Sequence, residues 1–177
     1  KDWEFRDHMF ASKAIANLKE FASQDAYFMT AVGFKLPHPV LHVPKTYYDM
    51  YEEQKDSLGR QADIERTFPR SAPLVSYHCG CDDEAFKTTS GETLPFGNVS
   101  SPVSLAVHRE LTQGYAAAVS FVDAQLGRIL DAVEELHLWK NLTIVVTSDH
   151  GALLGEKGIW GRKSLFDESA RVPLIIA

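Results

Sequence analysis

Two residues suited to metal binding directly follow an apolar run near the end of the sequence. Residues 142–147 are rich in β-branched side chains and lead into Ser148-Asp149-His150-Gly151. In open α/β sheets, ligands bind just beyond the carboxyl ends of the strands. Asp149 and His150 therefore form a candidate half of a metal site, where a hard cation such as Ca²⁺ would need further oxygen ligands from elsewhere. An Asp at a strand exit also caps turns and helices, and this alternative stays open.

A segment rich in glycine and positive charge follows at residues 155–164. Glycine allows the backbone to approach a ligand closely, and Arg162 and Lys163 could bind an oxyanion such as sulfate or phosphate. If the segment is extended, adjacent side chains point apart, so at most one of the two would face the site. The alternative is a solvated basic turn.

A histidine fixed between two prolines follows a second apolar run, at residues 26–32. His38 stands between Pro37 and Pro39, and a restrained imidazole at a strand exit can act as an acid or bind an anion. A lone histidine is otherwise a surface or structural residue. If both apolar runs are parallel strands of one sheet, His38 and Asp149 emerge at the same edge.

The pattern of apolar residues predicts an α/β protein with a mainly parallel central sheet flanked by helices. Helical spacing predicts helices over 8–24 and 104–136, and the apolar runs at 26–32 and 142–147 are typical of buried strands. A strand, a long helix and a second strand make a crossover unit. Residues 47–51 favour a short helix, and residues 52–100 are expected to form a loop-rich excursion.

Composition narrows the classes of partner. The 177 residues are 45% hydrophobic and 24% charged, and 18 basic against 24 acidic residues give a net charge of −6. An acidic chain of this kind argues against nucleic-acid and anionic-membrane partners, which favour a basic face. No apolar run reaches the roughly 18 residues of a membrane span. The last six residues, 172–177, are mostly apolar, and we expect a chain that stops there to be part of a longer one.

The two cysteines and the glycosylation triplets give weaker indications of function and location. Cys79 and Cys81 stand two residues apart, and a zinc site would need two more ligands, of which only His78 is near. Free or separately paired cysteines are the alternative. Asn98 and Asn141 each begin an N-glycosylation triplet, which fits a secreted or lumenal chain.

Four stretches in sequence order resemble the sulfatases of the alkaline-phosphatase superfamily, especially the branch that acts on iduronate sulfate. They are residues 31–38, residues 115–128, residues 147–156, and residues 160–175. The resemblance covers most of the chain outside residues 52–100. It implies that the whole chain is part of one catalytic domain with the alkaline-phosphatase-like fold.

The resemblance also implies roles for single residues. Asp149 would be a Ca²⁺ ligand, and His150 stands where most sulfatases have Asn and the iduronate type has His. His38 matches the active-site histidine near the sulfate ester. The family places a lysine two residues after the tryptophan of its Trp-Gly step; here Arg162 occupies that position and Lys163 follows. Arginine keeps the charge but cannot give up a proton.

The family's nucleophile is a formylglycine made from a Cys-x-Pro-x-Arg motif, which neither Cys79 nor Cys81 matches. Asp82-Asp83 resembles the family's aspartate pair but follows no buried strand. Both elements are expected in a preceding half, so this segment alone should be inactive. Complete, it would hydrolyse sulfate monoesters, on uronate or other sugars of glycosaminoglycans, in a lysosomal or secreted setting. Two rivals remain: an inactive sulfatase-like binding or structural protein, and a phosphoester or phosphonate hydrolase of the same superfamily.

Overall fold

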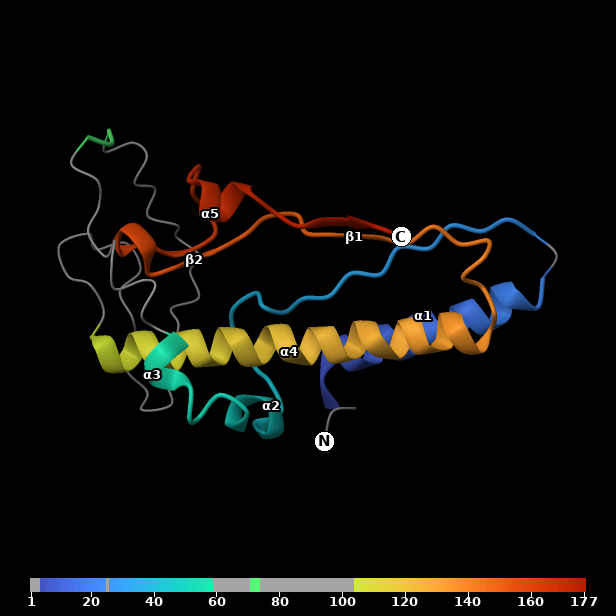
Figure 1. Cartoon of the computed structure of the whole chain (residues 1–177), viewed down its shortest axis with the longest axis horizontal. Helices are drawn as coiled ribbons and strands as arrows, with labels where there is room; N and C mark the ends of the chain where they lie inside the picture. The colour runs from blue at the N-terminus through green and yellow to red at the C-terminus, as the bar shows by residue number, and fades with distance from the viewer. Residues whose placement is uncertain (1–3, 25, 59–70, 74–103) are drawn as a thin grey trace. The chain divides into compact units, whose positions relative to one another are not determined.

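The computed structural model describes residues 4–24, 26–58, 71–73 and 104–177 (Figure 1). The helices and strands follow the order α1 (Arg6–Ala22), α2 (Lys45–Asp49), α3 (Lys55–Leu58), α4 (Leu105–Glu135), β1 (Val145–Thr147), β2 (Leu153–Leu154), η3 (Glu156–Gly158), β3 (Trp160–Gly161), α5 (Asp167–Ala170) and β4 (Leu174–Ile176). Two units form, and α4 contributes to both. The first unit contains residues 1–51 and 114–143, and the second contains residues 52–113 and 144–177.

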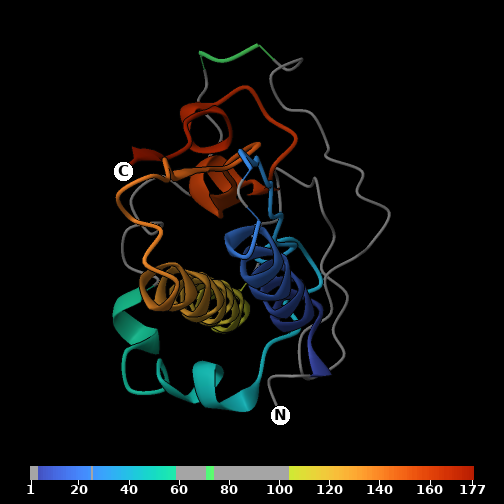
Figure 2. The same cartoon turned by 90° about the vertical axis from the view of Figure 1, so that its right-hand side faces the viewer.

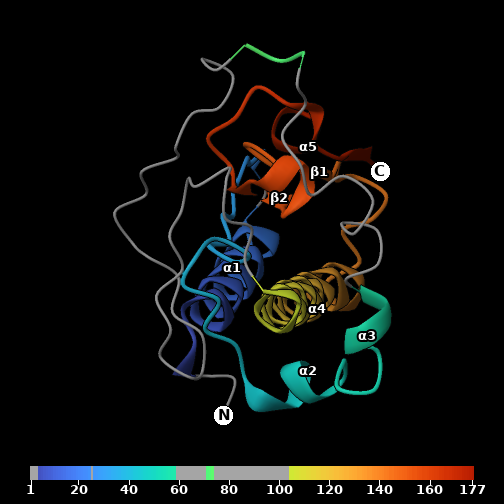
Figure 3. The same cartoon turned by 90° about the vertical axis from the view of Figure 1, so that its left-hand side faces the viewer.

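Two helices dominate the first unit and confirm the helical predictions within two residues. α1 and the C-terminal half of α4 lie side by side (Figures 2 and 3). Their apolar positions recur every three or four residues and are buried: Ala11, Ala14, Leu18, Ala117, Ala118, Phe121, Ala132 and Val133. Neither α4 nor any other described helix combines the length and apolarity needed to cross a membrane.

A guanidinium group joins the two helices. Arg128 of α4 donates hydrogen bonds to Gln125 Oε1 at 2.8 Å and to Ser12 Oγ at 2.9 Å, and its Nη1 lies 3.2 Å from His8 Nδ1. His8 and Ser12 belong to α1, so one side chain with several fixed donors sets the rotation of α1 against α4.

The predicted buried strand at residues 26–32 is wrong. The segment is extended, but it is not assigned as a strand and pairs with none among the described residues. Tyr27 and Met29 are almost completely exposed, whereas Phe28 stacks on Phe21 of α1 with ring centroids 4.9 Å apart. An extended apolar run becomes a strand only where a neighbour supplies hydrogen bonds, and the described part of the chain supplies none here.

The parallel central sheet is not confirmed either. β1 pairs antiparallel with β4, with Val146 opposite Ile175, and β2 pairs antiparallel with β3, with Leu154 opposite Trp160. β1 is shorter than the predicted 142–147 and is not buried: Val145 is 57% exposed, Thr147 is exposed and Val146 is half-buried. Its partner is the apolar run at residues 174–176, which pairs with it antiparallel.

The predicted short helix and the predicted loop-rich excursion remain to be compared with the structure. The short helix expected at residues 47–51 forms slightly earlier, as α2. Most of the loop-rich excursion at 52–100 lies outside the described residues, as do Cys79, Cys81, Asp82-Asp83 and Asn98.

A buried aromatic contact organises the second unit. Val107 and Leu111, at the start of α4, pack with Trp160 of β3, and the fully buried ring of His108 lies 5.3 Å from the Trp160 ring. Gly155 sits against this pair with φ +108°, and a Cβ there would lie 2.9 Å from His108 Nδ1. Both its backbone conformation and the available space therefore require glycine.

An ion pair closes the loop between η3 and α5. The Lys157 ammonium contacts Glu168 Oε1 and lies 5.1 Å from the centroid of the Phe166 ring. The hydrogen bond from Lys157 holds the pKa of the Glu168 carboxyl below its ordinary value of 4.5, while partial burial acts in the opposite direction. The loop so closed carries Arg162 and Lys163.

We predict that this ion pair gives the complete protein a pH-dependent share of its stability. The folded-state pKa of Glu168 is depressed, so the contribution is present above the unfolded value of 4.5 and is lost as the pH falls through the folded pKa. The difference in free energy of unfolding between wild type and Glu168→Gln should therefore be largest near neutral pH and should disappear at acidic pH. Thermal or denaturant unfolding between pH 7 and pH 3 measures it.

Lys157→Met is the matched variant, because it removes the other partner of the same pair. It should weaken the protein over the same pH range, and the double variant should lose less stability than the sum of the two single losses, because both substitutions break the same pair. A stability difference that stays constant from pH 7 to pH 3 would show that ionisation of Glu168 contributes nothing.

Candidate functional site

The turn after β1 is built from hydrogen bonds of its own residues. Ser148 Oγ donates to the carbonyl of His150 at 2.8 Å, and the backbone N–H of His150 donates to Asp149 Oδ1 at 2.9 Å. Thr147, the last residue of β1, donates its hydroxyl to the carbonyl of Pro173 at 3.0 Å. Asp149 thus does cap its turn, as the structural alternative expected, but with only one carboxylate oxygen.

The second oxygen of Asp149 faces the imidazole of His150. Asp149 Oδ2 lies 3.6 Å from His150 Nε2, and the two side chains are 84% and 38% exposed. His150 Nδ1 lies 2.9 Å from the carbonyl of Gly151. A carbonyl only accepts, so Nδ1 carries a hydrogen, and in the neutral ring the Nε2 lone pair is directed at the Asp149 side.

These two atoms fit part of a metal site. A carboxylate oxygen and an imidazole nitrogen with its tautomer fixed by a carbonyl are ordinary metal ligands. Calcium takes six to eight ligands, mostly oxygens, so two are too few. Within the described ranges, no three His, Cys, Asp or Glu side chains come together to hold a metal ion.

Close backbone packing fixes the turn in place. The N–H of Gly151 donates to the carbonyl of Ser169 in α5 at 2.9 Å. A Cβ at Gly151 would lie 2.2 Å from the backbone oxygen of Glu168, so any side chain would collide with α5. Gly151 therefore joins the Asp149–His150 turn to the segment whose Glu168 side chain closes the basic loop.

Arg162 and Lys163 follow β3 and differ in burial. Arg162 is half-buried and Lys163 is exposed. The N–H of Ser164 donates to the carbonyl of Arg162 at 2.8 Å, and Ser164 Oγ accepts from the N–H of Phe166 at 3.0 Å. This local turn distinguishes the two neighbours, with Arg162 the more enclosed.

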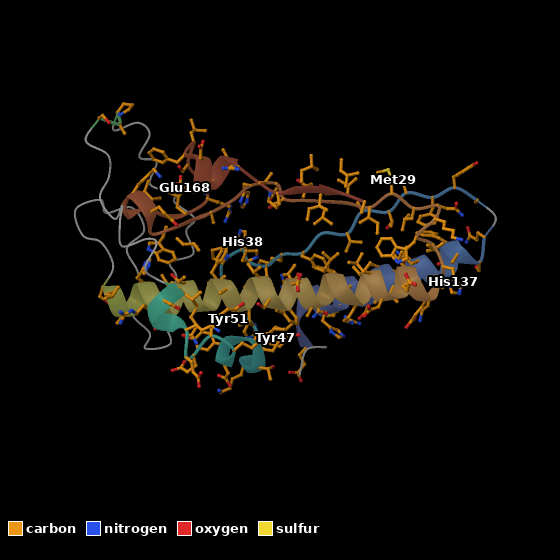
Figure 4. The ribbon with its side chains drawn as sticks, in the orientation of Figure 1. Met29, His38, Tyr47, Tyr51, His137 and Glu168 are labelled. Carbon is orange, nitrogen blue, oxygen red and sulfur yellow. The ribbon has the colours of Figure 1, made fainter. Side chains whose placement is uncertain are left out.

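His38 lies on the segment between α1 and α2 and is half-buried (Figure 4). Its backbone N–H donates to the carbonyl of Lys35 at 3.0 Å, and its Nδ1 contacts the carbonyl of Pro39. As in His150, Nδ1 must carry the hydrogen, which leaves Nε2 as the atom available to a ligand.

One buried residue that the sequence analysis did not single out supports this segment. Asp7, in the first turn of α1, is 2% exposed and accepts the backbone N–H groups of Lys35 and Leu36. These contacts span 28 and 29 positions of sequence. An acidic residue in a first helical turn has a local explanation in the helix dipole, so no sequence signal pointed to this second role.

The predicted site residues divide between the two units. Asp149, His150, Arg162 and Lys163 belong to the second unit, and His38 belongs to the first. That His38 and Asp149 share one edge therefore stays a prediction.

Comparison with known proteins identifies the family. The family model described as "Sulfatase" matches residues 3–177. The iduronate 2-sulfatase of Mus musculus is 32% identical over 172 residues, which is 96% of this chain and 30% of that protein. The iduronate 2-sulfatase of Homo sapiens is 32% identical over 171 residues, again 96% of this chain and 30% of the relative.

A solved structure supports the expected fold. The phosphonate monoester hydrolase of Agrobacterium radiobacter matches with a TM-score of 0.71 at 23% identity, over 99% of this chain and 33% of that one. The chain thus spans about a third of the proteins it matches. Because the family model runs through nearly every residue and two curated members agree over the same length, the chain belongs to the sulfatase family.

Proposed function

We propose that the complete protein hydrolyses sulfate monoesters and that this chain supplies part of its single catalytic domain. The observation that carries the proposal is the turn after β1, where Asp149 Oδ2 and His150 Nε2 lie 3.6 Å apart. Gly151 packs this turn on α5, and the Lys157–Glu168 ion pair closes the Arg162 loop on the same segment. The residues proposed to bind the metal and the anion thus both lie on segments that contact α5.

Asp149 and His150 are the residues that would hold Ca²⁺, with further oxygen ligands coming from outside the described part of the chain. Bound there, the ion would supply positive charge to polarise the sulfate group and the nucleophile. Asp149 would offer Oδ2, since Oδ1 already accepts the backbone N–H of His150. The Gly151 carbonyl keeps the His150 ring in the tautomer that presents Nε2.

Arg162, or its neighbour Lys163, would neutralise the sulfate oxygens. A guanidinium offers several donors in a fixed plane, which suits an oxyanion, and it is more effective where water is excluded. The half-buried position of Arg162 supports it over the exposed Lys163.

In its doubly protonated form, His38 would assist departure of the alcohol by giving it the proton from Nε2 and returning to the neutral ring, while Nδ1–H stays bonded to the carbonyl of Pro39. The nucleophile, a formylglycine in this family, is expected outside this chain. The segment alone should therefore be inactive.

The substrate class we propose is sulfated uronate or another sulfated sugar of glycosaminoglycans. It is supported by 32% identity to two relatives named iduronate 2-sulfatase and by His150 beside Asp149. Assays of the complete protein on a sulfated uronate, an aryl sulfate and a phosphonate monoester separate the possibilities. Turnover of the phosphonate alone would favour the phosphonate hydrolase, and no turnover at all would favour an inactive homologue.

We predict that Arg162→Ala lowers sulfatase turnover of the complete protein by at least about a hundredfold, on the scale of losing one oxyanion donor. Lys163→Ala is the matched control and should change turnover little, because that side chain is exposed. Steady-state kinetics on one sulfate ester measures both. A large loss in Lys163→Ala alone would transfer the role to Lys163, and near-normal turnover in both would leave only the solvated basic turn.

We also predict that Asp149→Ala weakens Ca²⁺ binding by the complete protein at least about tenfold, since it removes a charged ligand. Isothermal titration calorimetry with Ca²⁺ measures this without any substrate. Asp131→Ala, which removes an exposed carboxylate from α4, is the control and should bind Ca²⁺ like wild type. Equal dissociation constants for wild type and Asp149→Ala would remove Asp149 from the metal site.

A lysosomal or secreted location is proposed on the same basis, and Asn141 offers a check. Asn141 and Thr143 of its glycosylation triplet are both exposed. The complete protein expressed in a eukaryotic secretory cell should lose mass on enzymatic N-deglycosylation, and Asn141→Gln should lose one glycan. Identical masses for Asn141→Gln and wild type, apart from the substitution, would mean that the triplet is not used.

A further inference from the structure

A buried carboxylate accepts two hydrogen bonds from the backbone just before His38. Asp7 Oδ1 accepts the N–H of Lys35 at 2.8 Å, and Oδ2 accepts the N–H of Leu36 at 3.0 Å. Asp7 is 2% exposed, so water hardly competes for either oxygen. Two bonds from one planar group to consecutive amides fix both the position and the direction of the chain at Lys35–Leu36.

A buried charge is unfavourable unless it is well compensated, so this one is informative. Asp7 lies in the first turn of α1, where unpaired N–H groups and the helix dipole favour negative charge. A carboxylate only accepts hydrogen bonds, which matches a pair of N–H donors. Asp7 thus has the chemistry to hold an amide pair, and it uses both oxygens on the segment leading to His38.

The same end of α1 also holds the segment after His38. Phe5, the residue preceding α1, lies 5.0 Å from the His42 ring and 5.5 Å from the Phe121 ring of α4, between ring centroids. The Tyr47 ring packs on Phe121 at 5.2 Å. His38 is therefore carried on a short span held on both sides, with its own N–H bonded back to Lys35.

We propose that Asp7 is a positioning residue for His38. Its bonds to Lys35 and Leu36 set the backbone from which the imidazole projects and so fix where Nε2 is presented. The role rests on the proposed function, in which His38 protonates the leaving alcohol. Small displacements of a proton donor lower turnover steeply while leaving substrate binding nearly unchanged.

The test is a double-mutant cycle between Asp7→Asn and His38→Ala in the complete protein. Asparagine has nearly the same shape, but its single carbonyl oxygen can serve only one amide, and its NH₂ group faces the other as donor against donor. We expect kcat to fall about tenfold to a hundredfold with KM nearly unchanged. In the His38→Ala background, Asp7→Asn should cause no further loss, because the residue it positions is gone.

Two measurements complete the design. Glu20→Gln is the control, an exposed carboxylate neutralised on the same helix, and should leave kcat at the wild-type value. Amide hydrogen exchange at Lys35 and Leu36 should rise at least about tenfold in Asp7→Asn and stay unchanged in Glu20→Gln. If Asp7→Asn does not fold, Asp7→Ser, which keeps one acceptor, takes its place.

Each outcome discriminates. Loss in His38→Ala but normal kcat in Asp7→Asn would overturn the positioning role and leave the role of His38 intact. Equal fractional losses from Asp7→Asn in both backgrounds would show a general structural role, which also overturns it. Normal turnover in His38→Ala would refute the proposed role of His38 itself, and positioning by Asp7 would fail with it.

Discussion

The guanidinium of Arg128 is the constraint on which the first unit depends. It donates to Gln125 on its own helix and to Ser12 on α1, so α1 is held at one rotation against α4. That rotation places the start of α1, with Phe5 and Asp7, against the chain around His38. Arg128 bonds to Ser12 of α1, and Asp7 of the same helix bonds to Lys35 and Leu36, so α1 connects the long helix to the segment that carries His38.

In the second unit, the candidate site residues are held in place by a different kind of contact. There the critical contact is steric: Gly151 lies so close to the backbone of α5 that no Cβ fits. α5 also provides Glu168, whose ion pair with Lys157 fixes the ends of the basic loop. One four-residue helix thus positions both the Asp149–His150 turn and the Arg162 loop, although α5 provides none of the proposed ligands.

Local patterns predicted the parts of the molecule that depend on local interactions. The period of the apolar residues located α1 and α4 within two residues, because helical hydrogen bonds join residues four apart. The run at 26–32 has the composition of a strand, but a strand also needs a distant partner, which composition does not specify. The same distinction holds for the site residues. Asp149 and His150 are adjacent in sequence, so their pairing could be predicted, whereas the bonds from Asp7 to Lys35 and Leu36 join residues far apart in sequence and could not be.

The resemblance to sulfatases places a lysine where this chain has Arg162, and under the proposed function this difference would affect how the chemistry is shared between residues. A lysine beside the sulfate can stabilise negative charge and can also exchange a proton, but a guanidinium stays protonated at any working pH. Arg162 can therefore bind the sulfate oxygens without supplying the proton that the departing alcohol needs. Under the proposed function that proton would come from Nε2 of His38 in its doubly protonated form, with Nδ1–H bonded to the carbonyl of Pro39. Under that proposal, accurate placement of His38 would matter more than it would beside a second proton donor, and the bonds from Asp7 to Lys35 and Leu36 would provide that placement.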